Sequence, residues 1–183
     1  MFVLRRLFAI DSVAAARGLG DTRPALIALG HTPSHRAHVS VGAPLSRVVS
    51  QLIGAACLAN VPVYLLRGVA DDLYAGSPTL SELRRIELVD AEFLLRLQAD
   101  GVNTVFLVGG AEATALCIAE VALRCRLRPV LVREAFSHDP YSPANDFGNE
   151  DRTMHVDVFR VDDAIGSFFH CAGTPLVLHT LPR

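Results

Sequence analysis

Among the residues that could take part in chemistry, Cys117 has the most informative surroundings. It follows Gly109-Gly110 and lies near the start of a helix-patterned stretch that begins at Ala113. A helix N-terminus carries partial positive charge, which favours a thiolate, and its free N–H groups can stabilise an oxyanion. This setting indicates a reactive thiol. The alternative is a small buried core residue, the commonest fate of a free cysteine.

The residues around Cys117 predict a β-turn-α-β unit. Residues 104–108 form a nearly unbroken apolar run, typical of a strand buried on both faces of a parallel sheet. The glycine pair ends this run, an amphipathic helix follows until Pro129 ends it, and residues 130–132 form a second strand. A right-handed crossover places the turn at the carboxyl edge of the sheet, where open α/β sheets bind ligands. The third glycine of a dinucleotide fingerprint is missing, so NAD is not expected.

The rest of the chain also alternates between strands and helices. We predict strands at 25–29, 61–66 and 175–178, and a short strand or a turn at 155–159. Helices are predicted from Pro44 to Asn60, from Asp90 to Asp100 and from Asp162 to about Cys171. Residues 67–87 are rich in loop signals, with one helical turn at 80–84. This order predicts a single doubly wound α/β domain over 1–183, with an N-terminal arm or helix at 1–23 and an exposed loop at 136–154.

The central unit resembles the isochorismatase-like or cysteine-hydrolase superfamily, which includes nicotinamidases, N-carbamoyl amidohydrolases and isochorismatases. Its members carry a strand, a Gly-x-x-Thr-x-x-Cys turn with a cis peptide, a helix and another strand. Gly110, Thr114 and Cys117 supply these residue types, with one extra residue between the glycine and the threonine. The resemblance covers roughly 24–181 and implies a Rossmann-like parallel sheet of about six strands in the order 3-2-1-4-5-6.

Hydrolases of this superfamily use an Asp after the first strand, a Lys before the central helix, and the Cys. Carried onto this chain, the Asp position falls on Gly30 and the Lys position near Arg84 or Arg85. All seventeen basic residues are arginine, so the Lys is lost. Only Cys117 matches, and the resemblance therefore predicts a degenerate triad. His31, next to Gly30, could replace the Asp as the base of a Cys–His dyad; a solvated loop histidine is the alternative.

Several further residues are expected at the same rim of the sheet. Arg67 follows the second strand and could hold a carboxylate, and Glu134 and His138 follow the fourth. Each of these is more often an ordinary surface residue. Together the predicted substrate-binding residues are Gly30, Arg67, Arg84, Arg85, Gly110, Ala113, Thr114, Glu134 and His138.

Composition excludes some classes of function. With 183 residues, 51% hydrophobic content and a net charge of −2, the chain suits one globular domain and gives no reason to expect nucleic acid or an anionic membrane as a partner. No apolar run reaches the roughly 20 residues of a transmembrane helix. The four cysteines have no paired spacing, and His31, His35 and His38 do not follow a metal-binding pattern. We expect a cytoplasmic protein with reduced thiols and with neither metal nor cofactor.

Two functions remain as hypotheses. The first is a hydrolase or related lyase that acts through Cys117 on a small carbonyl, amide or carboxylate compound. The second is a catalytically inactive member of the superfamily that serves as a ligand-binding or oligomer-forming subunit. The retained cysteine favours the first, whereas loss of both the Asp and the Lys favours the second. The resemblance also implies a homo-oligomer with a small molecule as its ligand.

Overall fold

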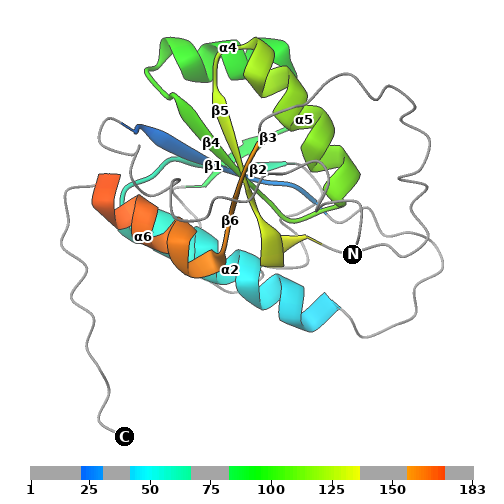
Figure 1. Ribbon diagram of the computed structural model, residues 1–183, viewed down its shortest axis with the longest axis vertical. Coiled ribbons are helices and arrows are strands. Elements are labelled where there is room, and N and C mark those ends of the chain that lie inside the picture. Colours follow the sequence, from blue (N-terminus) through cyan, green and yellow to red (C-terminus); the bar gives the residue numbers. More distant parts are fainter. Residues whose placement is uncertain (1–21, 31–41, 67–82, 137–155, 172–183) are drawn as a thin grey trace, which may run out of the picture.

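A parallel sheet with helices on both faces forms the centre of the protein (Figure 1). The computed structural model describes residues 22–30, 42–66, 83–136 and 156–171 of the chain. In chain order the elements are β1 (Pro24–Ala28), α2 (Gly42–Leu58), β2 (Val63–Leu66), β3 (Arg84–Ile86), α4 (Ala91–Ala99), β4 (Thr104–Val108), α5 (Glu112–Arg124), β5 (Arg128–Val132), the 3₁₀ turn η3 (Arg133–Ala135), β6 (Asp157–Phe159) and α6 (Val161–Cys171).

The strand order is β3-β2-β1-β4-β5-β6, and every neighbouring pair is parallel. The predicted doubly wound, Rossmann-like sheet of order 3-2-1-4-5-6 is therefore confirmed. The direction of winding reverses between β1 and β4, which are paired along their whole length. In sheets of this kind the carboxyl ends of the strands at such a reversal form the usual ligand crevice.

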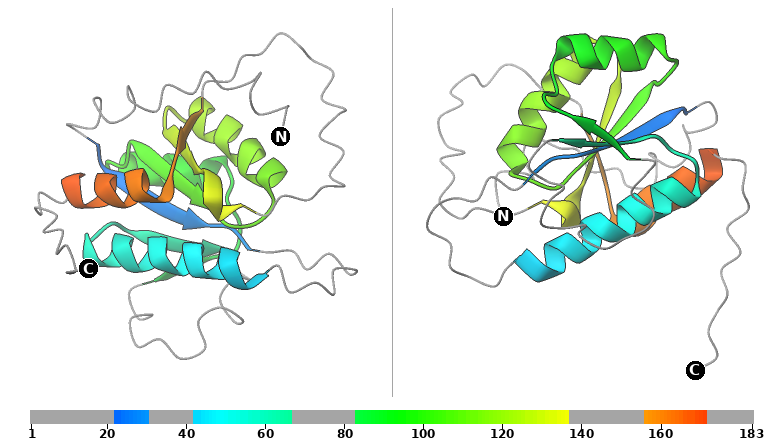
Figure 2. Two further views of the ribbon diagram at one scale, coloured as in Figure 1. Left: turned by 60° about the horizontal axis from the view of Figure 1, so that its bottom comes forward. Right: turned by 180° about the vertical axis from the view of Figure 1, so that it is seen from behind.

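The two faces of the sheet have separate cores. Helices α2 and α6 pack on one face, where the ring of Phe106 meets that of Phe168 edge-on at 4.9 Å between centroids. Helices α4 and α5 cover the other face, where Tyr64 and Phe93 make a similar contact at 5.1 Å. Figure 2 shows the two helix layers on either side of the sheet. Burial of β1 and β4 on both faces explains their unbroken apolar sequences.

Three helices end with the same backbone geometry. Asn60, Gly101 and Arg126 follow α2, α4 and α5, and each has a positive φ, between 55° and 87°. In each case the N–H of that residue and the N–H of the next donate to carbonyl groups of the last helical turn. The next residue is apolar and buried: Val61, Val102 or Leu127. This Schellman motif ends the helix and directs the chain into the following strand.

Several predicted boundaries need correction. Residues 84–86 form the edge strand β3 rather than the end of a helical turn; its exposed arginines hide the apolar alternation expected of a strand. Pro129 lies inside β5 and does not end α5, because the chain has already left the helix at Arg126. Phe136, predicted as the start of an exposed loop, is buried at 6% exposure. The strand alternative at 155–159 is confirmed as the shorter β6.

Other predictions lie outside the described residues: the N-terminal arm up to residue 21, the remainder of the 136–154 loop up to 154, and the strand at 175–178. Within the described ranges, none of the helices has the length and apolar character that crossing a membrane requires.

Candidate functional site

The carboxyl edge of the sheet brings together two residues predicted to belong to the site. Gly30 follows β1 and Gly110 follows β4, and a Cβ on Gly110 would lie 2.9 Å from the carbonyl oxygen of Gly30. The N–H of Leu29 donates to the carbonyl of Val108 at 2.7 Å, and the N–H of Gly109 donates to that of Ala135 at 2.8 Å. Backbone contacts therefore join the ends of β1, β4 and η3 closely at the point where a ligand crevice is expected.

Cys117 lies farther along α5 than its sequence position indicated. It is the sixth residue of the helix, in the second turn, so it is not among the residues with free N–H groups at the N-terminus. The face of α5 that packs on the sheet consists of Ala115, Ile118, Ala119 and Ala122. At about 100° per residue, Cys117 lies about 200° around the helix from Ala115, and its side chain is exposed to solvent.

The spacing of the superfamily pattern can also be counted from Gly109. Gly-x-x-Thr-x-x-Cys then needs no inserted residue: Glu112 stands at the Thr position and Ala115 at the Cys position. Ala115 lies in the first turn of α5 and is completely buried against the sheet. No cis peptide bond occurs in the described ranges, another departure from the pattern. The glycine pair allows both ways of counting, and the count from Gly110 reaches Cys117 with one inserted residue.

The other described candidates lie in different surroundings. Ala113 and Thr114 are exposed in the first turn of α5. Arg84 begins β3, where it donates to the hydroxyl of Tyr64 at 3.1 Å and lies 5.6 Å from the centroid of its ring. Arg85 is exposed on the same short strand. The remaining candidates, His31, Arg67 and His138, lie outside the described residues.

Glu134 has two partners at the carboxyl edge. Its carboxylate accepts a hydrogen bond from the N–H of Val161 at 3.2 Å and pairs with Arg160 at 3.7 Å. Val161 is the first residue of α6, so Glu134 caps that helix from a neighbouring element and places negative charge at its N-terminus. This capping role has no signal in the sequence, because the two residues are 27 positions apart.

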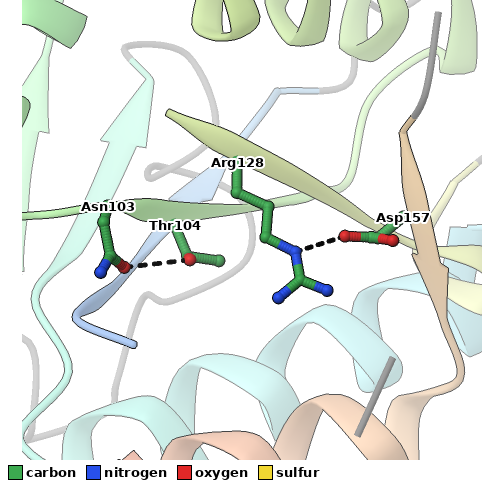
Figure 3. Close-up of polar contacts among 4 residues, drawn as sticks. All are labelled: Asn103, Thr104, Arg128 and Asp157. Carbon is green, nitrogen blue, oxygen red and sulfur yellow. Dashed lines mark hydrogen bonds and ion pairs between the residues drawn. The ribbon is translucent and has the colours of Figure 1, made fainter. Parts of the chain in front are cut away.

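Polar contacts at the opposite edge of the sheet are structural. Asn103 accepts hydrogen bonds from the N–H of Arg23 and the hydroxyl of Thr104, and Arg128 pairs with Asp157 across β5 and β6 (Figure 3). Among the residues that the structure describes, no group of three His, Cys, Asp or Glu side chains is placed to hold a metal ion.

Solved structures of other proteins share this arrangement. A cysteine hydrolase from Pseudomonas syringae pv. phaseolicola 1448A matches with a TM-score of 0.59 and 14% identity, over 81% of this chain and 93% of that one. The fold is that of the isochorismatase-like cysteine hydrolases. A putative isochorismatase from Burkholderia xenovorans LB400 also matches with a TM-score of 0.59, at 17% identity, over 86% of this chain and 91% of that one.

An N-carbamoylsarcosine amidase from Thermoplasma acidophilum matches with a TM-score of 0.57 and 16% identity, over 77% of this chain and 98% of that one. No family model matches the sequence, and no curated protein is a significant match. At these identities the likeness to an isochorismatase-like cysteine hydrolase concerns the fold, and the function depends on the residues of this chain.

Proposed function

We propose that this chain is a non-hydrolytic protein with the isochorismatase-like fold, which binds a small carboxylate or carbonyl compound at the carboxyl edge of its sheet. The observation that supports the loss of hydrolysis is the position of its thiol. Cys117 faces solvent on the outer side of α5, whereas the first-turn position above the sheet holds Ala115, which has no nucleophile.

Geometry makes attack by Cys117 at the sheet edge unfavourable. A nucleophile must come within about 3–3.5 Å of the reacting carbon, in line with the groups that stabilise the developing charge. The free N–H groups of α5 belong to its first turn, and Cys117 follows on a different side of the helix. A substrate held at these N–H groups would therefore not face the sulfur of Cys117.

The residues at the other two triad positions support the same proposal. Gly30, at the Asp position, has no side chain to take a proton from a thiol. Arg84, near the Lys position, is engaged with the hydroxyl and the ring of Tyr64. Binding itself needs none of these groups, because the carboxyl edge at a strand-order reversal is where open α/β sheets hold ligands. Arg67, which follows β2 in the sequence, is the proposed contact for a carboxylate.

A second candidate function is hydrolysis of an amide or N-carbamoyl compound, with the thiol of Cys117 as the nucleophile and His31 as the base. Exposure of the Cys117 sulfur favours it, because an accessible thiol can meet a substrate. Two of the similar structures are described as a cysteine hydrolase and an N-carbamoylsarcosine amidase, which indicates the reaction classes to assay.

One set of measurements separates the two candidates. The wild type and a Cys117→Ser variant are assayed for ammonia release from primary amides and N-carbamoyl amino acids, and small carboxylates are titrated by calorimetry. We expect no turnover above the buffer rate in either protein, and carboxylate binding that is equal in both and at least tenfold weaker in Arg67→Ala. Turnover by the wild type that disappears in Cys117→Ser would establish the hydrolase instead.

A further inference from the structure

The outer face of α4 carries an apolar stripe. Phe93, Leu94 and Leu97 face the sheet and are buried, which leaves the opposite side of the helix to solvent. On that side Ala91, Leu95 and Ala99 follow one another at a spacing of four residues, and all three are exposed. The Leu95 side chain is 50% exposed, so the middle of the stripe offers a large apolar group to a partner.

An acid and a base flank this stripe on one side. Glu92 and Arg96 are four residues apart and form a loose ion pair at 3.7 Å, with 80% and 68% of their side chains exposed. A surface pair of this kind contributes little to the stability of its own helix. Both side chains are therefore available to exchange partners at low energetic cost.

We propose that this face binds the same face of a second copy of the chain, with the two α4 helices antiparallel and the two-fold axis level with residue 94, midway between Glu92 and Arg96. For an antiparallel pair the axis is perpendicular to both helices and to the line joining them. Rotation about this axis leaves the flank of Glu92 and Arg96 on the same side of the helix pair and reverses the order of the residues along the partner helix. Glu92 therefore meets Arg96 of the partner subunit, and the symmetry makes this contact twice.

Charge complementarity selects a second copy over another partner. Leu95 lies one residue from the axis and packs against its copy in the partner, the alanines allow the helices to approach closely, and the antiparallel dipoles attract. Leu58, at the end of α2, is even more exposed at 77%, but α2 has no acidic residue in its first turn and no basic residue in its last. A helix of nine residues is about 13 Å long, so the contact is small and the dimer should be weak and reversible.

Sedimentation velocity over concentrations on the order of 10 to 500 µM tests the surface. We expect a concentration-dependent monomer–dimer equilibrium in the wild type, at least tenfold weaker dimerisation in Leu95→Arg, and no change in the matched control Leu58→Arg. A wild type that stays monomeric throughout, or a dimer that Leu95→Arg leaves intact, would overturn the proposal.

Charge exchange tests the antiparallel geometry. Glu92→Arg places only arginines on the flank, and Arg96→Glu places only glutamates there, so each variant alone should dimerise at least tenfold more weakly than the wild type. An equimolar mixture of the two should form a heterodimer, because every contact across the axis then joins opposite charges. Failure of the mixture to associate, with both variants folded by circular dichroism, would refute this geometry. Formation of a heterodimer would show that the charges meet between chains, because an ion pair within one chain cannot hold two chains together.

Discussion

The carbonyl oxygen of Leu29 lies so close to Gly109 that a Cβ on the glycine would be 2.6 Å from it. Leu29 follows β1 and Gly109 follows β4, so the contact lies where the order of the sheet reverses. Gly109 also has a φ of +78°, in the left-handed region that disfavours side chains. Close packing of two strand ends therefore requires glycine at this position, whatever ligand the edge of the sheet binds.

Gly109→Ala should destabilise the protein by about 2 kcal/mol or more, because the new methyl group meets a backbone carbonyl that cannot move independently of β1. The left-handed backbone adds to this cost. Urea denaturation followed by circular dichroism measures the free energy of unfolding. A loss below half of the expected value would mean that the two strand ends separate easily.

Gly54→Ala provides the matched control. Gly54 lies inside α2, and a Cβ there would have no atom within 4 Å. Alanine is the better helix former, so this variant should gain up to about 1 kcal/mol of stability. Opposite signs for the same substitution would show that local packing, and not the loss of a glycine, determines each result.

Arg126 is another position where the backbone favours glycine. It occupies the left-handed residue after α5 with a φ of 59°, whereas Gly101 occupies the equivalent position after α4. Arg126→Gly should raise the free energy of unfolding by roughly 0.5–1 kcal/mol, because it relieves the left-handed cost of a side chain. Gly101→Ala should lower it by a similar amount. A destabilised Arg126→Gly would indicate that the arginine side chain makes a compensating contact.

These helix ends show what the sequence could predict. Asn60 and Gly101 are residue types that favour a left-handed end, so the ends of α2 and α4 could be placed. Arg126 has no such preference, and the next strong breaker, Pro129, was three residues too late. The doubly buried strands β1 and β4 were predictable from their apolar runs, whereas the exposed edge strand β3 has an arginine-rich sequence without that signal.

The candidate site was less predictable than the fold. Counting the turn from Gly109 leads to Ala115, whereas counting it from Gly110 with one inserted residue leads to Cys117, two positions further along. On a helix a shift of two residues is about 200°, which exchanges the buried face for the exposed one. Periodicity places the helix, but it does not fix its rotation to within one residue when alanines fill both faces. The contact between Glu134 and Val161 depends on tertiary structure alone.

The four thiols should react with alkylating reagents at different rates. Cys117 is exposed and Cys125 is buried, with its sulfur 3.8 Å from the carbonyl oxygen of Ala91. Iodoacetamide at neutral pH, followed by peptide mass spectrometry, should modify Cys117 at least tenfold faster than Cys125. Burial raises the pKa of the Cys171 thiol, so Cys171 should also react more slowly than it does in the urea-unfolded chain. Equal rates for Cys117 and Cys125 would contradict the described orientation of α5.

Two substitutions of Glu134 separate its role as a helix cap from a role in ligand binding. Glu134→Ala removes the acceptor for the Val161 N–H and the partner of Arg160, and should cost about 1 kcal/mol of stability. Glu134→Gln keeps a side-chain oxygen for the N–H and loses only a half-exposed ion pair, so it should cost less than half as much. Thermal and urea unfolding measure both losses.

The same two variants are then titrated with any carboxylate that binds the wild type. If Glu134 acts only as a cap, Glu134→Gln should bind that carboxylate with unchanged affinity, because α6 keeps its N-terminal hydrogen bond. If the carboxylate of Glu134 also faces the ligand, removal of its negative charge should tighten the binding of an anion. An affinity that changes more than threefold in Glu134→Gln, with stability close to that of the wild type, would therefore assign Glu134 to the binding site as well as to the helix end.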